Sequence, residues 1–231
     1  WTGSRMIVWG GFDDGQRFNT GGIYNPENDN WVGTTSLVNA PSPRLHHVAA
    51  WTGKEMIIWG GEDDTGNRND GARYNPTTNT WTPMTMVDAP VGRQAAAAVW
   101  SGFEMIVWGG YVGPGTSTNT GARYNPATDT WAATTSEENA LSARQSLSAA
   151  WTGSKMILSH GAHSGGPFFD NGAMYAPPVL PRGTHPATIK VTAMGGLSQT
   201  APVTLTVGAP ILPNLKVTAS TPAPGSTLPG A

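Results

Sequence analysis

The sequence predicts an all-β protein built from four copies of one structural unit, and three observations support this prediction. The apolar hexapeptide MIVWGG begins at Met6, and close copies begin at Met56, Met105 and Met156. A tyrosine and an arginine recur with the same spacing of about 50 residues, which indicates an internal structural repeat. The 231 residues include 30 glycines and 19 prolines, and in the second copy of the unit these interrupt every stretch long enough for a helix. Many short strands joined by turns are therefore expected.

Four strands are expected in each unit, as the second unit illustrates. Residues 47–52 are predicted to form the first strand. Residues 55–59, with the sequence EMIIW, form the second, and their unbroken apolar run predicts burial on both faces. A diglycine follows, where the backbone must bend or pass another chain closely. The third strand is expected at residues 71–75, and the fourth begins at Trp81 after an Asn-Pro turn.

One segment of the second unit carries a family resemblance. Residues 60–84, GGEDDTGNRNDGARYNPTTNTWTPM, resemble a kelch repeat, with its diglycine, spaced tyrosine and following tryptophan. The pattern WTGxxMIVWGG…RYNPxTDTW along residues 1–178 is similar to bacterial kelch proteins, of the type seen in the central domain of galactose oxidase-like proteins. The resemblance implies a kelch-type β-propeller, in which each repeat is one blade and 4–8 blades surround a channel. The implied blades cover residues of about 1–40, 41–90, 91–140 and 141–178.

The fourth copy of the repeat departs from the pattern. Ser159 and His160 replace the tryptophan and the first glycine, and no tryptophan follows Tyr175. Terminal repeats are often atypical. We therefore expect three complete blades and one partial blade from the C-terminal part of a propeller, with further blades upstream of Trp1.

The composition changes over residues 176–231, which contain no aromatic or acidic residue and ten of the 19 prolines. Apolar and polar residues alternate in 188–193 and again in 203–207, which predicts a β-hairpin. Residues 179–209 resemble the final hairpin of an immunoglobulin-like module of bacterial surface proteins; alternatively, one of these strands completes the fourth blade. Residues 210–231 are expected to be a linker rich in proline, serine and threonine, or the start of another module.

Composition and charge exclude several classes of function. The net charge of −2, with 12% charged residues, gives no electrostatic basis for binding nucleic acid. No apolar run is long enough for membrane insertion. The chain contains no cysteine, so it cannot form a disulfide, a cysteine-ligated zinc site or a thiol nucleophile.

The resemblance also raises two enzyme classes. Galactose oxidase-like kelch proteins hold copper with tyrosine and histidine beside a tyrosine–cysteine crosslink, and this chain has no cysteine for it. The Ser-x-Asp-x-Gly-x-x-Trp boxes of sialidase-type propellers are absent. We therefore expect no catalytic residue, metal or cofactor, and a protein or carbohydrate ligand bound outside the cell or at its surface. The alternatives are a scaffold for catalytic residues outside this chain, and a structural spacer in an adhesin.

Function is expected where the units differ, because a residue that recurs in every unit serves the scaffold. The loops between the second and third strands, 12–20, 62–70, 111–120 and 162–171, differ most. The candidate ligand-binding residues in these loops are Asp13, Asp14, Arg17, Asp63, Asp64, Arg68, Tyr111, His163, Phe168 and Phe169. The first two loops share an acidic pair followed by an arginine. Calcium binding is one interpretation; turn-forming acids with a local ion pair are favoured, because the D-x-D-x-D-G spacing is absent.

The remaining polar candidates have structural interpretations beside functional ones. The repeated Arg44, Arg93 and Arg144 are expected to bond strand ends or carbonyls, with a charged ring for an acidic ligand as the alternative. The repeated tyrosines and tryptophans are expected to pack between blades, with a platform for sugars as the alternative. His160 and His163 near Asp170 form a weak transition-metal candidate. His46 and His47 occur in one unit only, and packing at a strand edge is expected for them.

Overall fold

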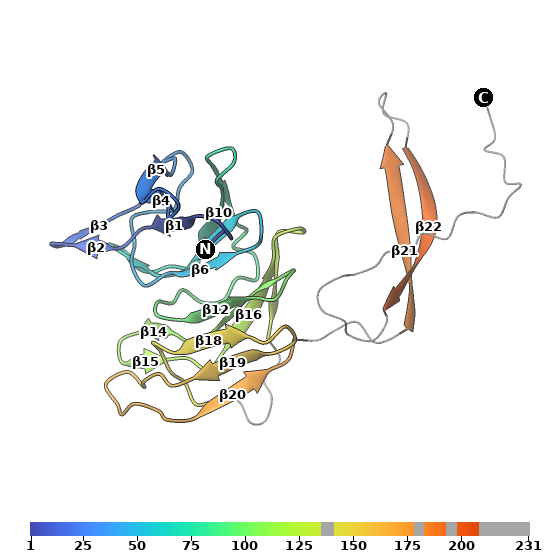
Figure 1. The fold of residues 1–231 in the computed structure, drawn as a ribbon. Coiled ribbons are helices and arrows are strands. Elements are labelled where there is room, and N and C mark those ends of the chain that lie inside the picture. Colours follow the sequence, from blue (N-terminus) through green and yellow to red (C-terminus); the bar gives the residue numbers. More distant parts are fainter. Residues whose placement is uncertain (135–140, 178–182, 193–197, 208–231) are drawn as a thin grey trace, which may run out of the picture. The chain divides into compact units, whose positions relative to one another are not determined.

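The computed structural model describes residues 1–134, 141–177, 183–192 and 198–207 (Figure 1). Contacts divide the chain into two compact units, Trp1–Pro177 and Pro178–Ala231. Within the described ranges every regular element is a β-strand. The predicted all-β fold is therefore confirmed.

Four antiparallel sheets follow one another along the first compact unit, one for each copy of the repeat. We number these copies unit 1 to unit 4. Unit 1 contains β1 (Met6–Trp9), β4 (Gly21–Asn25) and β5 (Asn30–Thr34). Unit 2 contains β6 (Val48–Trp51), β7 (Met56–Trp59), β10 (Gly71–Asn75) and β11 (Thr80–Pro83). Unit 3 contains β12 (Ala97–Trp100), β13 (Met105–Trp108), β16 (Gly121–Asn125) and β17 (Thr130–Ala133), and unit 4 contains β18 (Ser148–Trp151), β19 (Met156–Ser159) and β20 (Gly172–Tyr175).

The number of complete units differs from the expectation. In the part of the chain that the structure describes, two of these sheets have four strands and two have three, so two units are complete there rather than three. Unit 1 has three strands, and its Trp1 corresponds to Trp51, the last residue of β6 in unit 2. Among the described residues of unit 4, the fourth strand is the missing one, as the loss of its tryptophan predicts.

The hydrophobic core lies in the junctions between consecutive units. Met56 and Ile58 of β7 pack in the cluster shared with unit 1, whereas Ile57 and Trp59 pack in the cluster shared with unit 3. All four side chains are buried, as the unbroken apolar run predicts. A third cluster joins units 3 and 4 through Ile106, Trp108, Met156 and Leu158. Figure 1 shows the resulting stack of sheets, from β1 in blue to β20 in orange.

The diglycine of unit 2 combines a bend with a close approach of chains. Gly60 and Gly61 have φ angles of 71° and 88°, which favour glycine. A Cβ atom on Gly60 would lie 2.9 Å from the carbonyl oxygen of Arg93, and one on Gly61 would lie 2.6 Å from that of Leu45. The amide of Gly61 donates to the Arg93 carbonyl at 2.8 Å. The repeated glycines thus connect each unit to the next.

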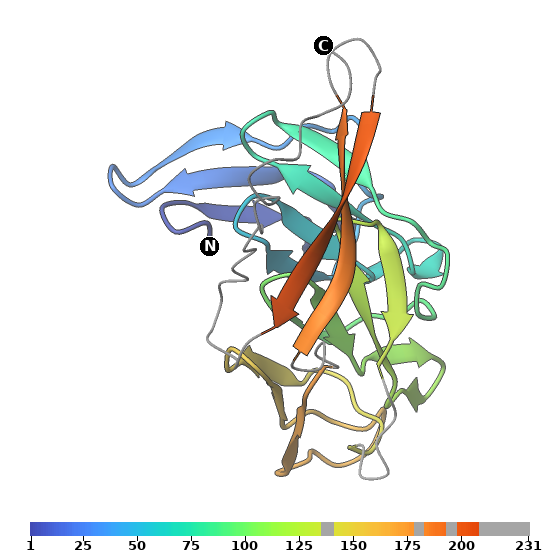
Figure 2. The same cartoon turned by 90° about the vertical axis from the view of Figure 1, so that its right-hand side faces the viewer.

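The second compact unit contains one antiparallel strand pair, β21 (Gly183–Thr192) and β22 (Ser198–Val207) (Figure 2). The predicted hairpin is confirmed, with longer strands than the alternating segments alone indicated. Its identity as an immunoglobulin-like fragment stays a prediction, and so does the alternative that it completes the fourth blade. Residues 210–231 lie outside the described part of the chain. The described residues contain no helix long and apolar enough to cross a membrane.

Candidate binding surface

The loops that differ between units begin with short β-hairpins directly after the diglycines. These are β2 (Phe12–Asp13) with β3 (Gln16–Arg17), β8 (Glu62–Asp63) with β9 (Gly66–Asn67), and β14 (Tyr111–Gly113) with β15 (Thr116–Ser117). In unit 4 a single bridge joins Ala162 and Phe168. We call residues 12–17, 62–67, 111–117 and 162–168 the hairpin surface. In Figure 1, β2, β3, β14 and β15 lie along the same edge of the stacked sheets.

Each hairpin bonds to the hairpin of the next unit. Arg17 of unit 1 forms ion pairs with Glu62 and, at 2.8 Å, with Asp64 of unit 2. The Asn67 side-chain amide donates to the Tyr111 carbonyl at 3.1 Å. The Ser164 backbone N–H donates to the Ser117 hydroxyl oxygen at 3.2 Å. These contacts join the four hairpins into one continuous surface.

The expected local ion pair in the first loop is wrong. Arg17 pairs with the neighbouring unit rather than with Asp13 or Asp14, because Glu62 and Asp64 approach it across the junction. Asp14 instead has a φ angle of 44°, which fits a turn-forming role. The hydrogen bonds and ion pairs that raise the pKa of Arg17 come chiefly from Glu62 and then from Asp64.

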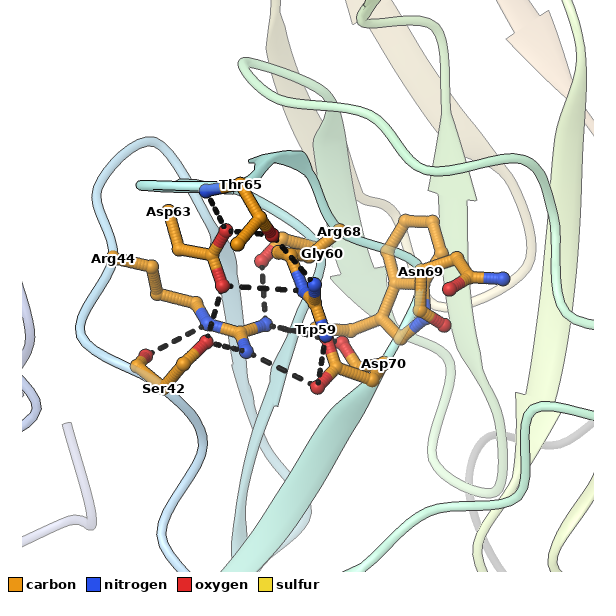
Figure 3. Close-up of polar contacts among 9 residues, drawn as sticks. All are labelled: Ser42, Arg44, Trp59, Gly60, Asp63, Thr65, Arg68, Asn69 and Asp70. Carbon is orange, nitrogen blue, oxygen red and sulfur yellow. Dashed lines mark hydrogen bonds and ion pairs between the residues drawn. The ribbon is translucent and has the colours of Figure 1, made fainter.

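In the second loop the expected local ion pair is present (Figure 3). Asp63 lies 3.4 Å from Nε of Arg68 and accepts hydrogen bonds from the amide and hydroxyl of Thr65 and from the Ser42 hydroxyl. Burial alone would raise the pKa of Asp63, but these bonds and the Arg68 charge outweigh it and hold the pKa at about 2. Asp63 is buried. It therefore stabilises the hairpin, and Arg68 holds it in place.

The repeated arginines are buried and structural, as predicted. Arg44 is fully buried, and its Nη1 donates to the Gly60 carbonyl at 3.0 Å (Figure 3). It also forms an ion pair with Asp70 at 3.0 Å. The same bond to the end of the second strand is made from Arg93 to the Gly109 carbonyl at 3.0 Å and from Arg144 to the His160 carbonyl at 2.9 Å. Their burial leaves no charged ring facing a ligand.

The aromatic repeat also packs between units, as predicted. Trp59 of unit 2 lies against Trp131 of unit 3, with 5.2 Å between ring centroids, and Trp9 lies against Trp81 at 5.4 Å. Tyr74 packs beside Trp81 within its own unit. Trp81 and Trp131 are buried, so neither forms a platform for a sugar.

Several predicted site residues do face outward. Phe168 is 87% exposed, and Asp13, Asp14, Asp64 and His163 are exposed as well. Tyr111 is half-buried. Phe169 is different, because its ring covers the guanidinium of Arg144 at 4.1 Å and serves the scaffold.

Sequence reasoning missed two residues of the hairpin surface. Phe12 is 53% exposed at the start of β2. Glu62 bonds to Arg17 on one side and accepts a hydrogen bond from Gln94 on the other, and Gln94 in turn bonds to Nδ1 of His46 at 2.9 Å. The signal was available in the sequence, since the position after the diglycine differs in every unit: Phe12, Glu62, Tyr111 and Ala162.

The metal alternatives find no support in the geometry. Among the residues described here, no three histidine, aspartate or glutamate side chains are grouped as a metal site would require. Nδ1 of His160 bonds to the Ser159 hydroxyl, and Nδ1 of His163 bonds to the Ser164 carbonyl at 3.1 Å. The carboxylate of Asp63, a member of the calcium candidate, is occupied by protein donors.

Comparison with known proteins agrees with this architecture. A family model described as the KLHDC2/KLHL20/DRC7 Kelch-repeats domain matches residues 1–161. No curated protein matches the chain. Kelch-repeat domains generally mediate protein binding. The match covers more than half of the sequence and includes every strand of the four sheets except β20. The chain therefore belongs to the kelch-repeat family, and its four sheets are blades of a β-propeller.

Proposed function

We propose that this chain is a non-catalytic protein-binding module that recognises its partner through the hairpin surface. One observation carries the proposal: the hairpins are bonded to one another and to a buried scaffold, while the outward side chains differ from unit to unit. A surface that is already ordered loses little conformational entropy on binding, which favours affinity.

The exposed side chains suggest what the partner presents. Phe12 and Phe168 are large apolar groups exposed by 53% and 87%, and aromatic residues often anchor protein interfaces. The exposed carboxylates of Asp13, Asp14 and Asp64 lie on two of the same hairpins. We infer a partner with an apolar patch beside basic residues, because complementary charge steers association and selects partners.

A matched set of phenylalanine variants tests the proposal. The doubly substituted chain, Phe12→Ser with Phe168→Ser, is immobilised beside the unchanged chain, and the proteins retained from a cell extract are quantified by mass spectrometry. Phe103→Ser is the control, because Phe103 is 54% exposed but precedes β13, at the opposite end of that strand from the hairpin. Specific partners should be lost from the double variant only. Retention of the same proteins by all three chains would contradict the proposal.

Carbohydrate is the second candidate ligand, favoured by the exposed rings of Phe12 and Phe168 and the half-buried ring of Tyr111. Aromatic faces pack against the apolar faces of sugars through the same burial of apolar area that anchors proteins. A glycan array probed with the same three chains separates the two candidates. Sugar binding that depends on Phe12 and Phe168 would favour carbohydrate.

The biological setting is proposed from the sequence resemblance. We propose a secreted or cell-surface protein of a bacterium, with galactose oxidase-like kelch blades and an immunoglobulin-like fragment at residues 179–209. The alternatives are a scaffold whose catalytic residues lie outside this chain and a spacer in an adhesin. The flanking coding sequence distinguishes them, since an oxidase requires a Cys, Tyr and His set on another blade, whereas an adhesin requires tandem surface modules.

A further inference from the structure

A second candidate site lies between units 1 and 2, at the opposite end of the second strands from the hairpin surface. It is a pocket of about 470 Å³ next to the turns that precede β1 and β7. This volume falls within the range of about 300–1,000 Å³ that is typical of ligand sites. Its lining includes Arg5, Ile23, Val32, Trp51, Lys54 and Thr77.

The pocket is positively charged, and its main cation has no partner among the described residues. Arg5 and Lys54 line it, and no acidic residue does. Nη1 of Arg5 is buried and makes no hydrogen bond, and the Arg5 guanidinium forms no ion pair with any residue that the structure describes. An arginine group that is partly withdrawn from water without a partner favours an incoming anion.

The next junction shows what this position normally contains. In unit 2, Glu55 occupies the position of Arg5, and Arg73 occupies the position of Ile23. The Arg73 guanidinium donates to the Pro126 carbonyl of unit 3 at 2.8 Å and lies 3.6 Å from Glu55. At the third junction, Glu104 and Arg123 form the same pair, at 2.9 Å.

The first junction therefore differs by two linked changes. Arg5 replaces the acid, and Ile23 replaces the arginine that would fill the space. Pro76, the counterpart of Pro126, also lines the pocket, so its carbonyl lacks the donor that Arg73 supplies in the next unit. The pocket thus offers an unpaired cation and a backbone acceptor beside the apolar surfaces of Ile23 and Trp51.

We propose that this pocket binds an aspartate or glutamate side chain of a linear peptide segment. The peptide carboxylate pairs with Arg5, as the Glu55 carboxylate pairs with Arg73 at the next junction. A peptide N–H donates to the Pro76 carbonyl. An apolar neighbour of the acidic residue packs against Ile23, Val32 and Trp51. This site does not depend on the hairpin surface, because it is built from different residues at the other end of the strands.

A pair of blocked peptides tests the proposal on the full chain. The probe is an N-acetylated, C-amidated, fluorescein-labelled hexapeptide with one aspartate between leucines; its twin carries asparagine instead. Fluorescence anisotropy should show binding of the aspartate peptide and at least about tenfold weaker binding of the twin, because the charge-assisted bidentate contact is lost. Equal binding of the two peptides, or no binding of either, would overturn the proposal.

Three variants connect binding to the pocket. Arg5→Gln should weaken binding of the aspartate peptide by about tenfold or more. Lys155→Gln is the control and should leave binding unchanged, because Lys155 occupies the Arg5 position in unit 4 and does not line the pocket. The double variant Arg5→Glu with Ile23→Arg rebuilds the pair of the next junction. It should melt no lower than the unchanged chain and bind no peptide. Full affinity in Arg5→Gln contradicts the proposal, while unchanged affinity in the Phe12 and Phe168 variant shows that the two sites are separate.

Discussion

At the scale of single residues, His47 shows how the packing of one unit against the next sets a protonation state. Its ring meets Trp9 edge-on at 5.2 Å, and its Nδ1 is buried without a hydrogen bond to any described residue. Burial, together with the charges of Arg44 and His46, lowers the pKa of His47 to about 4. The side chain is therefore neutral in the folded protein at pH 7.

This depressed pKa predicts acid destabilisation in a defined window. The unfolded chain takes up the proton near pH 6.5 and the folded chain only near pH 4. Stability is therefore lost as pH falls from 6.5 to 4, by about 3 kcal/mol in total. His47→Ala and His47→Leu introduce the residues found at this position in units 3 and 4, Ala96 and Leu147. Urea unfolding at pH 7 and pH 4.5 should show that both variants lose less free energy of unfolding between these pH values than the unchanged chain. An equal loss in the variants and the unchanged chain contradicts the depressed pKa of His47.

A second residue-scale prediction concerns the buried arginines. Arg93 is 1% exposed and donates to the carbonyls of Val91, Gly109 and Thr120. Arg93→Met should destabilise the fold by about 3 kcal/mol, because three carbonyls lose their donor inside the protein. Arg93→Lys should rescue little, since one ammonium cannot replace the planar guanidinium. Arg5→Met is the control with no lost bond. Chemical denaturation measures all three, and equal losses for Arg93→Met and Arg5→Met would refute this role.

At the scale of elements, the fourth strand of one blade is stabilised by the second strand of the blade before it. Trp131 on β17 packs on Trp59 and donates from Nε1 to the Thr85 carbonyl at 3.1 Å. Trp31 on β5 occupies the same repeat position but is 58% exposed. Trp131→Ala should therefore cost about 3–5 kcal/mol, and Trp31→Ala about 1 kcal/mol or less. Thermal or urea unfolding compares them, and similar costs would argue against this junction.

The sequence predicted the elements best where a periodic pattern extended over several residues. The unbroken apolar run of β7 and the repeated Gly-Ala-Arg-Tyr-Asn of β10 and β16 located these strands within one residue. The two-residue strands of the hairpins contain too few positions to show any period. Register between units could not be predicted either, because the pairing of Arg17 with Asp64 depends on how neighbouring blades stack.

The candidate sites were predicted only in part for a related reason. Exposed residues such as Phe168 follow from the rule that variable loops carry recognition. Burial of Asp63 depends on Ser42 and Thr65, which come from another loop and from the hairpin turn. The pocket at Arg5 depends on a missing arginine at Ile23, and such an absence has meaning only once the Arg73 contacts are known.

At the scale of the whole molecule, three core clusters join the four blades of Trp1–Pro177 to one another. Every residue of β7 and β13 is buried, whereas Met6 and Val8 of β1 are 39% and 43% exposed and Ile157 of β19 is 39% exposed. In such arrays, stability depends on neighbouring units. The two inner blades therefore have more support than the outer two.

Hydrogen exchange should follow this gradient. Amides of β7 and β13 should exchange more slowly than those of β1 and β19, because local opening requires least free energy where one side of a strand lacks a packed neighbour. Mass spectrometry of deuterated peptides measures the order of the exchange rates of these four strands. Slowest exchange in β1 would contradict the arrangement.

Recognition through the hairpin surface is the central claim, and site-specific photo-crosslinking tests it most directly. Benzoylphenylalanine replaces Phe12, Phe168 or, as the control, Phe103, and each chain is irradiated with the extract that supplies its partners. We predict that crosslinks to the same partner protein form at positions 12 and 168, are suppressed by excess unmodified chain, and are absent at position 103. Crosslinking to that partner at position 103 alone, or at none of the three positions, would contradict the claim.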